Sequence, residues 1–479
     1  MDQDKLHVAI ISSPGVGHLV PVLLLGDRLA THHGLDVTIL VVTTETSPVE
    51  SQLLNVSTHL NLIKIPSPDI SNKVYPDDTM VTQLAILMRE ARPSIRSAIS
   101  AMDRRPHVLI GDLFSSELLP IADEFKLQKY VFVPCSARFV ALTMYLHVLD
   151  NEVKGQYVDQ IKPLRVPGCL PVWGQDVPDT MLDRDNRQYH EYVRMGINFT
   201  TLSDGVLINT WRDLESISLD ALRYNEMLRS VVRVPVYGIG PLTGEVDETG
   251  LEGNEVINWL DKQPVESVLF VSFGSGGTPS AEQITELAQG LELSHQKFVW
   301  VVRPPAKGTH NGAYFTSGSG LDKPSDFLPK GFLDRTLKQG FVVSLWASQV
   351  KILNHESVGG FLTHCGFNSV HESIRGGVPM IAWPLYAEQK LNATLLTEEL
   401  KVAVRPMVWP TEKVVRREEI EKMVRSLMEG EEGKMLREKV KLLRESGNEA
   451  LSMNGSSYKS MCEFISCCKM KCACISSPN

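Results

Sequence analysis

The sequence predicts an α/β protein built from two Rossmann-like domains, each with a parallel sheet. Its 479 residues exceed one ordinary domain, and its 43% hydrophobic and 22% charged residues are typical of a globular protein. A buried strand over residues 6–12 runs into a glycine turn and a helix, and the same sequence of elements begins again at residues 267–273. Several predicted strands also end in polar side chains. Parallel strands bring their carboxyl ends to one crevice, so these side chains indicate ligand sites.

The first half of the chain predicts strands alternating with helices over most of its length. Strands are expected over residues 6–12, 37–42, 108–112, 130–134, 205–209 and 234–239, and helices from about 20, over 116–125, around 139–149, from about 187 and over 211–228. The opening βαβ unit raises the alternative of a nicotinamide-dependent oxidoreductase. Its glycine turn lacks the third glycine of the dinucleotide fingerprint, and Asp36 precedes the second strand instead of ending it. That alternative is therefore weakly supported.

The second half of the chain repeats the pattern after a polar stretch without periodicity. Strands are expected over 267–273, 298–302, 341–345, 359–363 and 379–384, and helices over 281–293, from near 369, around 420–427 and on to about 464. The predicted divisions are an N-terminal domain over 1–240, a linker over 241–253, a second domain over 254–450, a terminal helix over 451–466 and a disordered tail over 467–479. The glycine- and serine-rich loop over 303–327 is too long for a simple connection, so it is predicted to be mobile and is a candidate lid.

Charge and cysteine placement narrow the class of protein. A net charge of −9 supplies no basic face for nucleic acid. The N-terminal apolar run is too short and too acidic in front for a signal peptide, and no window approaches a membrane span. Five of the eight cysteines lie near the C-terminal end, over residues 462–474, which argues against a secreted disulfide framework. A metal site is not expected there either, because this segment has no histidine. A cytoplasmic enzyme is expected.

Residues 346–389 combine three kinds of binding chemistry in one stretch. Trp346 follows a strand, where a flat ring can stack on a nucleobase. The turn over 364–369 leads into a helix, whose exposed N–H groups and positive dipole end suit a diphosphate. Glu372 can accept hydrogen bonds from a ribose diol, and Glu388 with Gln389 fits sugar hydroxyls. The alternative is a buried strand–helix–strand unit with an incidental polar turn, and the glycine turn near 274–278 is equally compatible with a simple tight turn.

This 44-residue stretch resembles the signature box of plant UDP-dependent glycosyltransferases (family 1, GT-B fold) from its opening Trp to its closing Gln. The resemblance implies two facing Rossmann-like domains, an acceptor site in the first and a UDP-sugar site in the second, with the terminal helix returning to the first. The donor site it implies consists of Ser275, Trp346, Ala347, Gln349, His364, Gly366, Asn368, Ser369, Glu372, Tyr386, Glu388 and Gln389.

Two positions depart from the family pattern. Ser348 replaces a usual Pro and is expected to loosen a turn; Phe367 replaces a usual Trp and is expected to weaken donor binding.

The resemblance also implies a catalytic pair in the first half. His18 follows the turn Pro14-Gly15-Val16-Gly17, where the family places its catalytic base. From the segment alone, the less favoured alternative is a turn histidine held by backbone groups. Asp112 ends a predicted strand and can meet His18. The alternative for Asp112 is the N-cap of the following helix, although two apolar residues intervene. The acceptor-binding candidates are Gly17, Phe114, Ser136 and Phe139.

The activity implied by the resemblance is inverting transfer of glucose from UDP-glucose to a small phenolic or indolic acceptor, such as a hydroquinone, a monolignol or indoxyl. UDP-glucose is then the co-substrate, no metal or other cofactor is expected, and the protein is expected to be a monomer without a nucleic-acid or membrane partner. In the family, Gln at position 389 accompanies glucose. A catalytically silent sugar-nucleotide sensor is the other alternative, and it is disfavoured because His18 and Asp112 are both present. The acceptor itself is set by pocket shape, which the sequence does not define.

Overall fold

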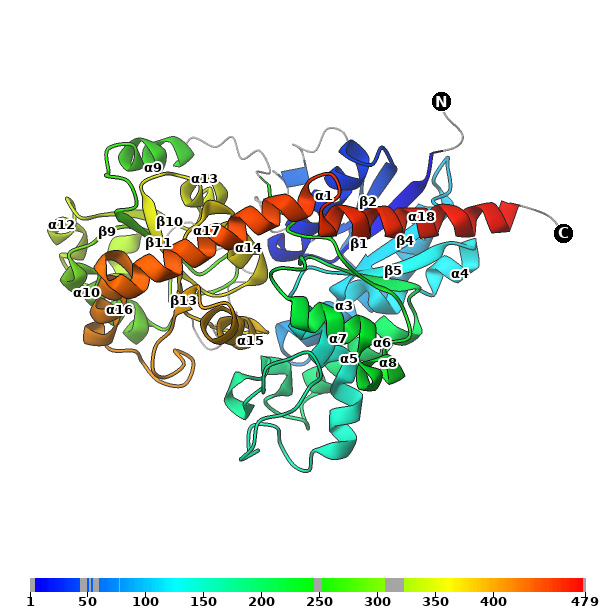
Figure 1. The fold of residues 1–479 in the computed structure, drawn as a ribbon, viewed down its shortest axis with the longest axis horizontal. Helices are drawn as coiled ribbons and strands as arrows, with labels where there is room; N and C mark the ends of the chain where they lie inside the picture. The colour runs from blue at the N-terminus through cyan, green and yellow to red at the C-terminus, as the bar shows by residue number, and fades with distance from the viewer. Residues whose placement is uncertain are drawn as a thin grey trace. The chain divides into compact units, whose positions relative to one another are not determined.

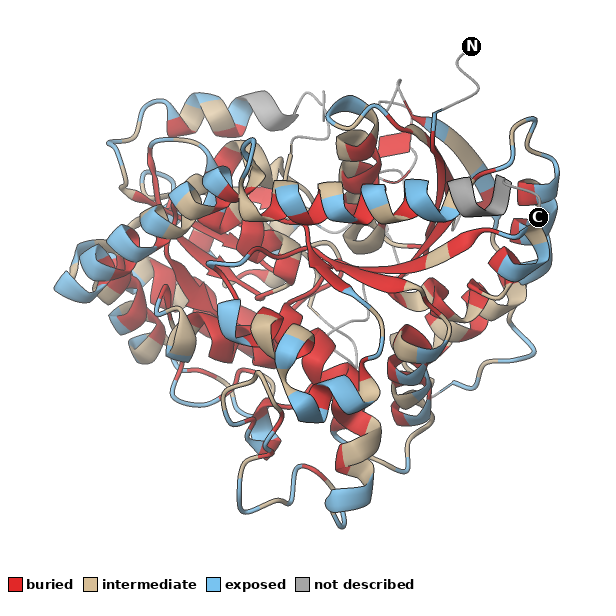
Figure 2. Ribbon diagram, turned by 45° about the vertical axis from the view of Figure 1, so that its right-hand side comes forward, coloured by how far each residue is buried: buried red, intermediate tan, exposed pale blue. Residues whose placement is uncertain are grey.

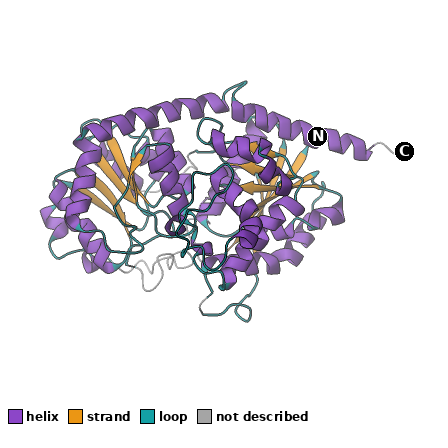
Figure 3. Cartoon of the chain, turned by 60° about the horizontal axis from the view of Figure 1, so that its bottom comes forward, coloured by secondary structure: helices purple, strands orange, loops and turns teal. Residues whose placement is uncertain are grey.

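The computed structural model describes residues 5–43, 50, 53–54, 60–76, 78–244, 252–305 and 323–476, with the side chains of 252–254 and 473–476 excepted. The chain divides into two compact units, Met1–Val246 with Gly447–Asn479, and Asp247–Ser446. The described residues of each unit form one parallel sheet with helices on both of its faces (Figures 1 and 3). The predicted fold class, two Rossmann-like α/β domains, is confirmed.

Among the described residues, the sheet of the first unit has seven parallel strands in the order β3-β2-β1-β4-β5-β6-β7. The strands are β1 (His7–Ser12), β2 (Asp36–Thr43), β3 (Asn61–Pro66), β4 (Val108–Asp112), β5 (Gln128–Val133), β6 (Gly205–Ile208) and β7 (Val236–Gly238). Strands β1, β4 and β6 are buried along their whole length, as expected where helices cover both faces of a sheet (Figure 2). Because β1 and β4 are neighbours in parallel, their carboxyl ends lie side by side.

The helices of the first unit are α1 (Val16–Thr31), α3 (Met80–Ser100), η1 (Leu113–Leu118), α4 (Ile121–Phe125), α5 (Ala137–Glu152), η2 (Gly174–Asp176), η3 (Asp179–Met181), α6 (Arg187–Thr201), α7 (Ser216–Tyr224) and α8 (Glu226–Val231). The single helix predicted over 211–228 is wrong. The chain instead breaks at Asn225, whose side-chain oxygen accepts hydrogen bonds from the N–H groups of Met227 and Leu228 and so begins α8.

The C-terminal helix α18 (Ser456–Ser476) belongs to the first unit. Phe464 contacts the rings of Tyr130 and Tyr237, with centroids 4.9 and 5.9 Å apart, and the Gln128 amide donates to the carbonyl of Cys468 at 2.8 Å. The disordered tail predicted from residue 467 is therefore wrong as far as Ser476. The helix continues because Cys468 is fully buried in the core of the unit, and Cys472 packs against that core.

The described part of the second unit contains a six-stranded parallel sheet in the order β10-β9-β8-β11-β12-β13. Its strands are β8 (Val268–Ser272), β9 (Lys297–Val302), β10 (Gly340–Ser344), β11 (Val358–Thr363), β12 (Met380–Ala382) and β13 (Ala403–Val404). Its helices are α9 (Glu252–Leu260), α10 (Ala281–Ser294), α11 (Pro324–Phe327), α12 (Phe332–Arg335), α13 (Gln349–Leu353), α14 (Phe367–Gly376), α15 (Gln389–Thr394), the π-helix η4 (Leu395–Glu399), α16 (Arg417–Glu429) and α17 (Glu431–Leu451). The last residues of α17, 447–451, belong to the first unit.

Two expectations concern segments that the structure covers only in part. Residues 306–322 of the predicted lid and residues 245–251 of the predicted linker lie outside the described residues. Within the described ranges, no helix combines the length and the apolar composition that a membrane crossing requires.

Candidate active site

His18 lies in the first turn of α1. The helix was expected from about residue 20, with His18 on the preceding loop, and it begins four residues earlier, at Val16. The reason is Gly15, the N-cap residue, whose φ of 104° reverses the chain directly after β1. The backbone N–H of His18 donates to the carbonyl of Gly15 at 3.0 Å. This short connection fixes His18 at the carboxyl end of β1.

Asp112 ends β4, the neighbour of β1, and is fully buried. One carboxylate oxygen accepts hydrogen bonds from the N–H and hydroxyl of Ser13, and the other accepts from the N–H and hydroxyl of Ser115. Asp112 is thereby the N-cap of η1, so the expectation that capping was less favoured is wrong. It fails because a tight 3-10 turn begins directly after Asp112, so that Leu113 and Phe114 belong to the capped helix instead of separating it from its cap.

The structure brings His18, Asp112 and Phe114 together. The rings of His18 and Phe114 make an edge contact, with centroids 5.2 Å apart and planes at 71°. Burial lowers the pKa of the His18 imidazole below its ordinary 6.5, and the Asp112 carboxylate partly opposes that shift. The imidazole is therefore neutral near pH 7, which is the form that can accept a proton.

The other acceptor candidates have different surroundings. Around Gly17, an added Cβ would meet no heavy atom within 4 Å, so the chain is open there. Ser136 is fully buried and caps α5 by accepting from the N–H of Phe139 at 3.1 Å, and the Phe139 ring stacks on Tyr192 with centroids 5.9 Å apart. Each of these contacts helps to hold α5 in place. Glu50, which sequence reasoning missed, accepts from the Gly15 N–H at 2.7 Å.

In the second unit, the turn between β11 and α14 carries His364. The helix was expected to begin near Ser369, and it begins two residues earlier at Phe367, with Gly366 as an N-cap that supplies no side-chain acceptor. The His364 ring lies between two glycines: an added Cβ on Gly274 would come within 2.5 Å of it, and one on Gly366 within 2.4 Å. Glycine at both positions is what permits this close approach.

His364 is buried, and its Nδ1 has no hydrogen-bond partner within the described parts of the chain. Burial lowers its pKa to about 4, with the nearby Arg303 guanidinium adding to the effect. The imidazole is therefore a neutral group beside the uncapped first turn of α14. A helix start without a side-chain cap, beside a buried imidazole nitrogen without a partner, is suited to a phosphate group.

Gln349 links three predicted donor-site residues across two elements. Its amide nitrogen donates to the Ser369 hydroxyl at 2.8 Å and to a Glu372 carboxylate oxygen at 2.6 Å. The start of α13 is thereby fixed to the first two turns of α14. Trp346 and Ala347, both partly exposed, occupy the connection from β10 to α13, and Asn368 lies in the first turn of α14.

Gln389 has one fixed orientation. Its amide oxygen accepts from the backbone N–H groups of Leu385 and Tyr386 at 2.9 and 3.1 Å. Since backbone N–H groups can only donate, the amide oxygen faces them and the amide nitrogen must face the other way. The preceding Glu388 accepts from the amide nitrogen of Asn392 at 3.1 Å.

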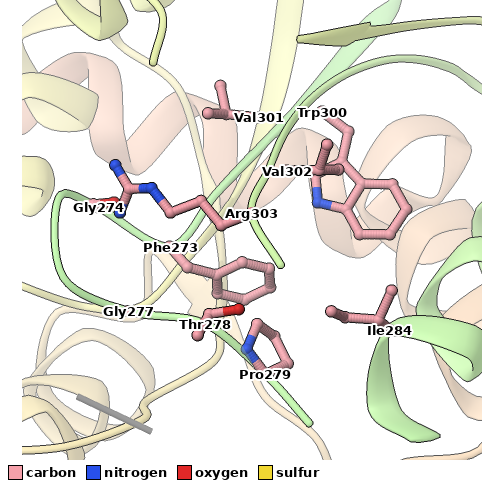
Figure 4. Close-up of a pocket in the computed structure, with 10 residues that line it drawn as sticks. All are labelled: Phe273, Gly274, Gly277, Thr278, Pro279, Ile284, Trp300, Val301, Val302 and Arg303. Atoms are coloured by element: carbon pink, nitrogen blue, oxygen red, sulfur yellow. Dashed lines mark hydrogen bonds between the residues drawn. The ribbon is translucent and has the colours of Figure 1, made fainter. Parts of the chain in front are cut away.

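A pocket in the second unit adjoins the glycine-rich turn after β8, close to Ser275 (Figure 4). Its lining residues are Phe273, Gly274, Gly277, Thr278, Pro279, Ile284, Trp300, Val301, Val302 and Arg303. Figure 4 shows the Arg303 guanidinium directed toward Gly274 and away from Trp300. The sequence predicts only a loop at Arg303, since a lone arginine at a strand end carries no distinguishing pattern.

Phe367 and Ser348, the two departures from the family pattern, have ordinary structural roles in the second unit. Phe367 is 3% exposed, and its ring packs on His371 with centroids 4.5 Å apart. Ser348 is the N-cap residue of α13 but makes no side-chain capping bond. Among the described residues, no group of three or more His, Cys, Asp or Glu side chains is arranged to hold a metal ion.

Candidate sites thus lie at the carboxyl ends of both sheets. The first unit has a histidine–carboxylate pair, and the second has a helix start suited to an anion, with polar neighbours.

Comparison with known proteins identifies the family of the chain. Residues 251–434 match the family model "UDP-glucoronosyl and UDP-glucosyl transferase". The chain is 50% identical to anthocyanidin 3-O-glucosyltransferase 5 of Manihot esculenta over 95% of this chain and 94% of that one. It is 40% identical to hydroquinone glucosyltransferase of Rauvolfia serpentina, with 96% and 97% covered.

Solved structures are similar over the same length. The crystal structure of TcCGT1 in complex with UDP has 46% identity and a TM-score of 0.91, covering 97% of this chain and 99% of that chain. Phytolacca americana UGT2, complexed with UDP-2fluoro-glucose and pterostilbene, has 35% identity and a TM-score of 0.86, with 97% and 100% covered. The fold and the two sites define a sugar-nucleotide-dependent transferase. The chain belongs to the family of plant UDP-dependent glycosyltransferases, and the nicotinamide-dependent alternative is not supported.

Proposed function

We propose that the protein transfers glucose from UDP-glucose, with inversion, to the hydroxyl group of a small phenolic or indolic acceptor, giving a β-O-glucoside and UDP. The observation that carries the proposal is the start of α14, where Gly366 leaves the first turn uncapped beside His364. The relatives named as glucosyltransferases of anthocyanidin and hydroquinone support glucose as the sugar and a phenol as the acceptor.

In the proposed mechanism, neutral His18 accepts the proton of the acceptor hydroxyl as its oxygen attacks the anomeric carbon. The anomeric C–O bond to the β-phosphate breaks, and its electron pair leaves with UDP from the opposite face of the sugar. Asp112, fixed by Ser13 and Ser115, orients the imidazole and stabilises the imidazolium that forms. His364 and the N–H groups at the start of α14 stabilise the departing diphosphate.

In this proposal, each part of UDP-glucose contacts a different set of side chains in the second unit. Trp346 stacks on the uracil, and Glu372, held by Gln349, accepts from the ribose hydroxyls. Ser369 accepts from Gln349, so its own hydroxyl proton is available to a phosphate oxygen. Ser275, Ala347, Asn368 and Tyr386 line the same site in this proposal.

The decisive experiment incubates the purified protein with UDP-glucose and a panel of hydroquinone, monolignol and indoxyl acceptors. Released UDP and the mass of the glucoside are measured, and the anomeric coupling constant is read by NMR. We expect UDP release with at least one phenol and a β-linked product. An α-linked product would exclude inversion, and binding of UDP-glucose without release under any condition would favour a silent sensor.

Divalent metal is expected to be dispensable. The positive features at the diphosphate turn are a helix N-terminus and a neutral histidine, which stabilise the leaving group through N–H donors. Initial rates should be almost unchanged in excess EDTA. Loss of most activity in EDTA, restored by magnesium, would contradict this prediction.

UDP-glucose is expected to exceed UDP-galactose in kcat/KM by about tenfold or more, the effect of one misplaced hydrogen bond. The reason is the fixed amide of Gln389, whose nitrogen can only donate to a sugar hydroxyl oxygen at one position. The glucose and galactose donors differ in the direction of one hydroxyl. Gln389→His should narrow the ratio, because an imidazole cannot reproduce the amide geometry. A galactose preference in the wild-type protein would overturn the assignment.

A further inference from the structure

Three residues other than glycine have left-handed backbone conformations beside the proposed donor-site residues. They are Leu345 (φ 65°), Cys365 (φ 64°) and Ala387 (φ 57°). Leu345 directly precedes Trp346, Cys365 separates His364 from Gly366, and Ala387 directly precedes Glu388. Such conformations are unfavourable for side chains with a Cβ, and they persist only where surrounding contacts hold them. The contacts that hold them therefore control how the site residues are aimed.

Leu345 is held by the end of β9. Its N–H donates to the carbonyl of Val302 at 2.9 Å, and its carbonyl accepts from two nitrogens of Arg303 at 3.1 and 2.9 Å. A third nitrogen of the same guanidinium donates to the carbonyl of Gly274 at 2.6 Å. Arg303 thus ties the turn that carries Trp346 to the glycine-rich turn against which His364 packs.

Cys365 is held from α15. Its carbonyl accepts from the amide nitrogen of Asn392 at 3.0 Å, and its N–H donates to the hydroxyl of Thr363 at 3.2 Å. The same amide nitrogen donates to the Glu388 carboxylate at 3.1 Å. Asn392 is fully buried, so these bonds are shielded from competing water. The Asn392 side chain thereby fixes the position of the Glu388 carboxylate, a predicted sugar-binding group, relative to the turn predicted to bind the diphosphate.

We propose that Arg303 and Asn392 are positioning residues for the UDP-sugar: Arg303 aims the ring that receives the uracil, and Asn392 aims the diphosphate turn and the sugar-binding carboxylate. This inference deepens the proposed function and rests on its donor site. The proposed role depends on the geometry of each hydrogen-bonding side chain as well as on its ability to donate. A guanidinium presents several N–H groups in a rigid fork, whereas a lysine ammonium presents a single point charge, so lysine cannot replace the three bonds of Arg303.

The first test measures dissociation constants for uridine and UDP by calorimetry or competition. Arg303→Lys should weaken uridine and UDP alike, by about tenfold or more, because misplaced Trp346 no longer stacks on the base. Arg303→Met should do the same. If Arg303→Lys binds both ligands as tightly as the wild type, or if only UDP is weakened, the guanidinium does not position Trp346 and the inference for Arg303 is wrong.

The second test uses Asn392→Ala and the near-isosteric Asn392→Asp, which lacks the amide donor. Both should weaken UDP and UDP-glucose by about tenfold or more while uridine binding stays within about twofold of the wild type. Unchanged UDP affinity in both variants, or an equal loss for uridine, would overturn the inference for Asn392.

Matched controls separate positioning from general stability. Arg437 donates to the carbonyl of Gly359, at the opposite end of β11 from His364, and buried Gln283 donates to and accepts from the backbone of Val415. Arg437→Lys and Gln283→Ala should lower the melting temperature without changing uridine or UDP affinity at a temperature where the protein is folded. If the wild type binds neither ligand, the proposed function itself fails; if the wild type binds and the Arg303 and Asn392 variants bind equally, only the present inference fails.

Discussion

Replacing His18 with alanine is expected to lower kcat by on the order of 10²–10⁴-fold, the usual contribution of a positioned general base. The affinity for UDP should be nearly unchanged, because the proposed UDP contacts all belong to the second unit. The loss should be larger for an aliphatic alcohol than for a phenol, since a phenol ionises more readily without help. Steady-state rates with both acceptor types, together with calorimetric binding of UDP, measure these effects.

The matched control is His32→Ala, an exposed histidine at the C-cap of the same helix, which should leave kcat unchanged. The wild-type pH profile gives an independent check. Burial places the pKa of His18 below 6.5, so kcat/KM should stay level as pH falls to about 6.5 and then decline as the imidazole becomes protonated. Near wild-type kcat in His18→Ala with the aliphatic acceptor would mean that another group is the base.

The strands and the donor stretch were predictable because their signals are local. Apolar runs such as 108–110 give buried parallel strands, and the residues just after such strands lie at the carboxyl ends of the sheets, as Trp346 and His364 do. The early start of α1 was missed because it depends on the positive φ of Gly15, which a glycine permits but does not require.

The remaining misses depend on contacts between residues far apart in the sequence. The helical tail is stabilised by the burial of Cys468 against Gln128 and Tyr130, 338 or more positions away along the chain, and no local pattern records such a partner. Arg303 and Asn392 act on backbone carbonyls, which every residue has, so the residue types at Leu345 and Cys365 gave no indication of them. Local periodicity defines elements, whereas these residues are defined by where elements meet.

Asp112→Asn is expected to damage both activity and stability, although the two side chains have nearly the same shape. Each oxygen of Asp112 accepts from one backbone N–H and one hydroxyl, at Ser13 on one side and Ser115 on the other. Whichever way an asparagine amide is turned, its NH₂ group faces one of these two backbone N–H groups. A buried N–H that loses its acceptor costs about 1–3 kcal/mol, so the free energy of unfolding should fall by about that amount.

The activity loss should have a distinct pH signature. Burial lowers the pKa of His18, and the negative charge of Asp112 partly opposes this. Asparagine removes that charge, so the pKa should fall further and the acid limb of kcat/KM should move to lower pH while kcat falls. Urea unfolding and pH–rate profiles of Asp112→Asn, Ser115→Ala and the wild type measure the two effects separately. Ser115→Ala keeps the carboxylate and one backbone donor on each oxygen, so it should lower stability less than Asp112→Asn and leave the acid limb near its wild-type position. An Asp112→Asn protein with wild-type stability and an unmoved acid limb would show that this carboxylate neither holds the turn at β1 nor acts on His18.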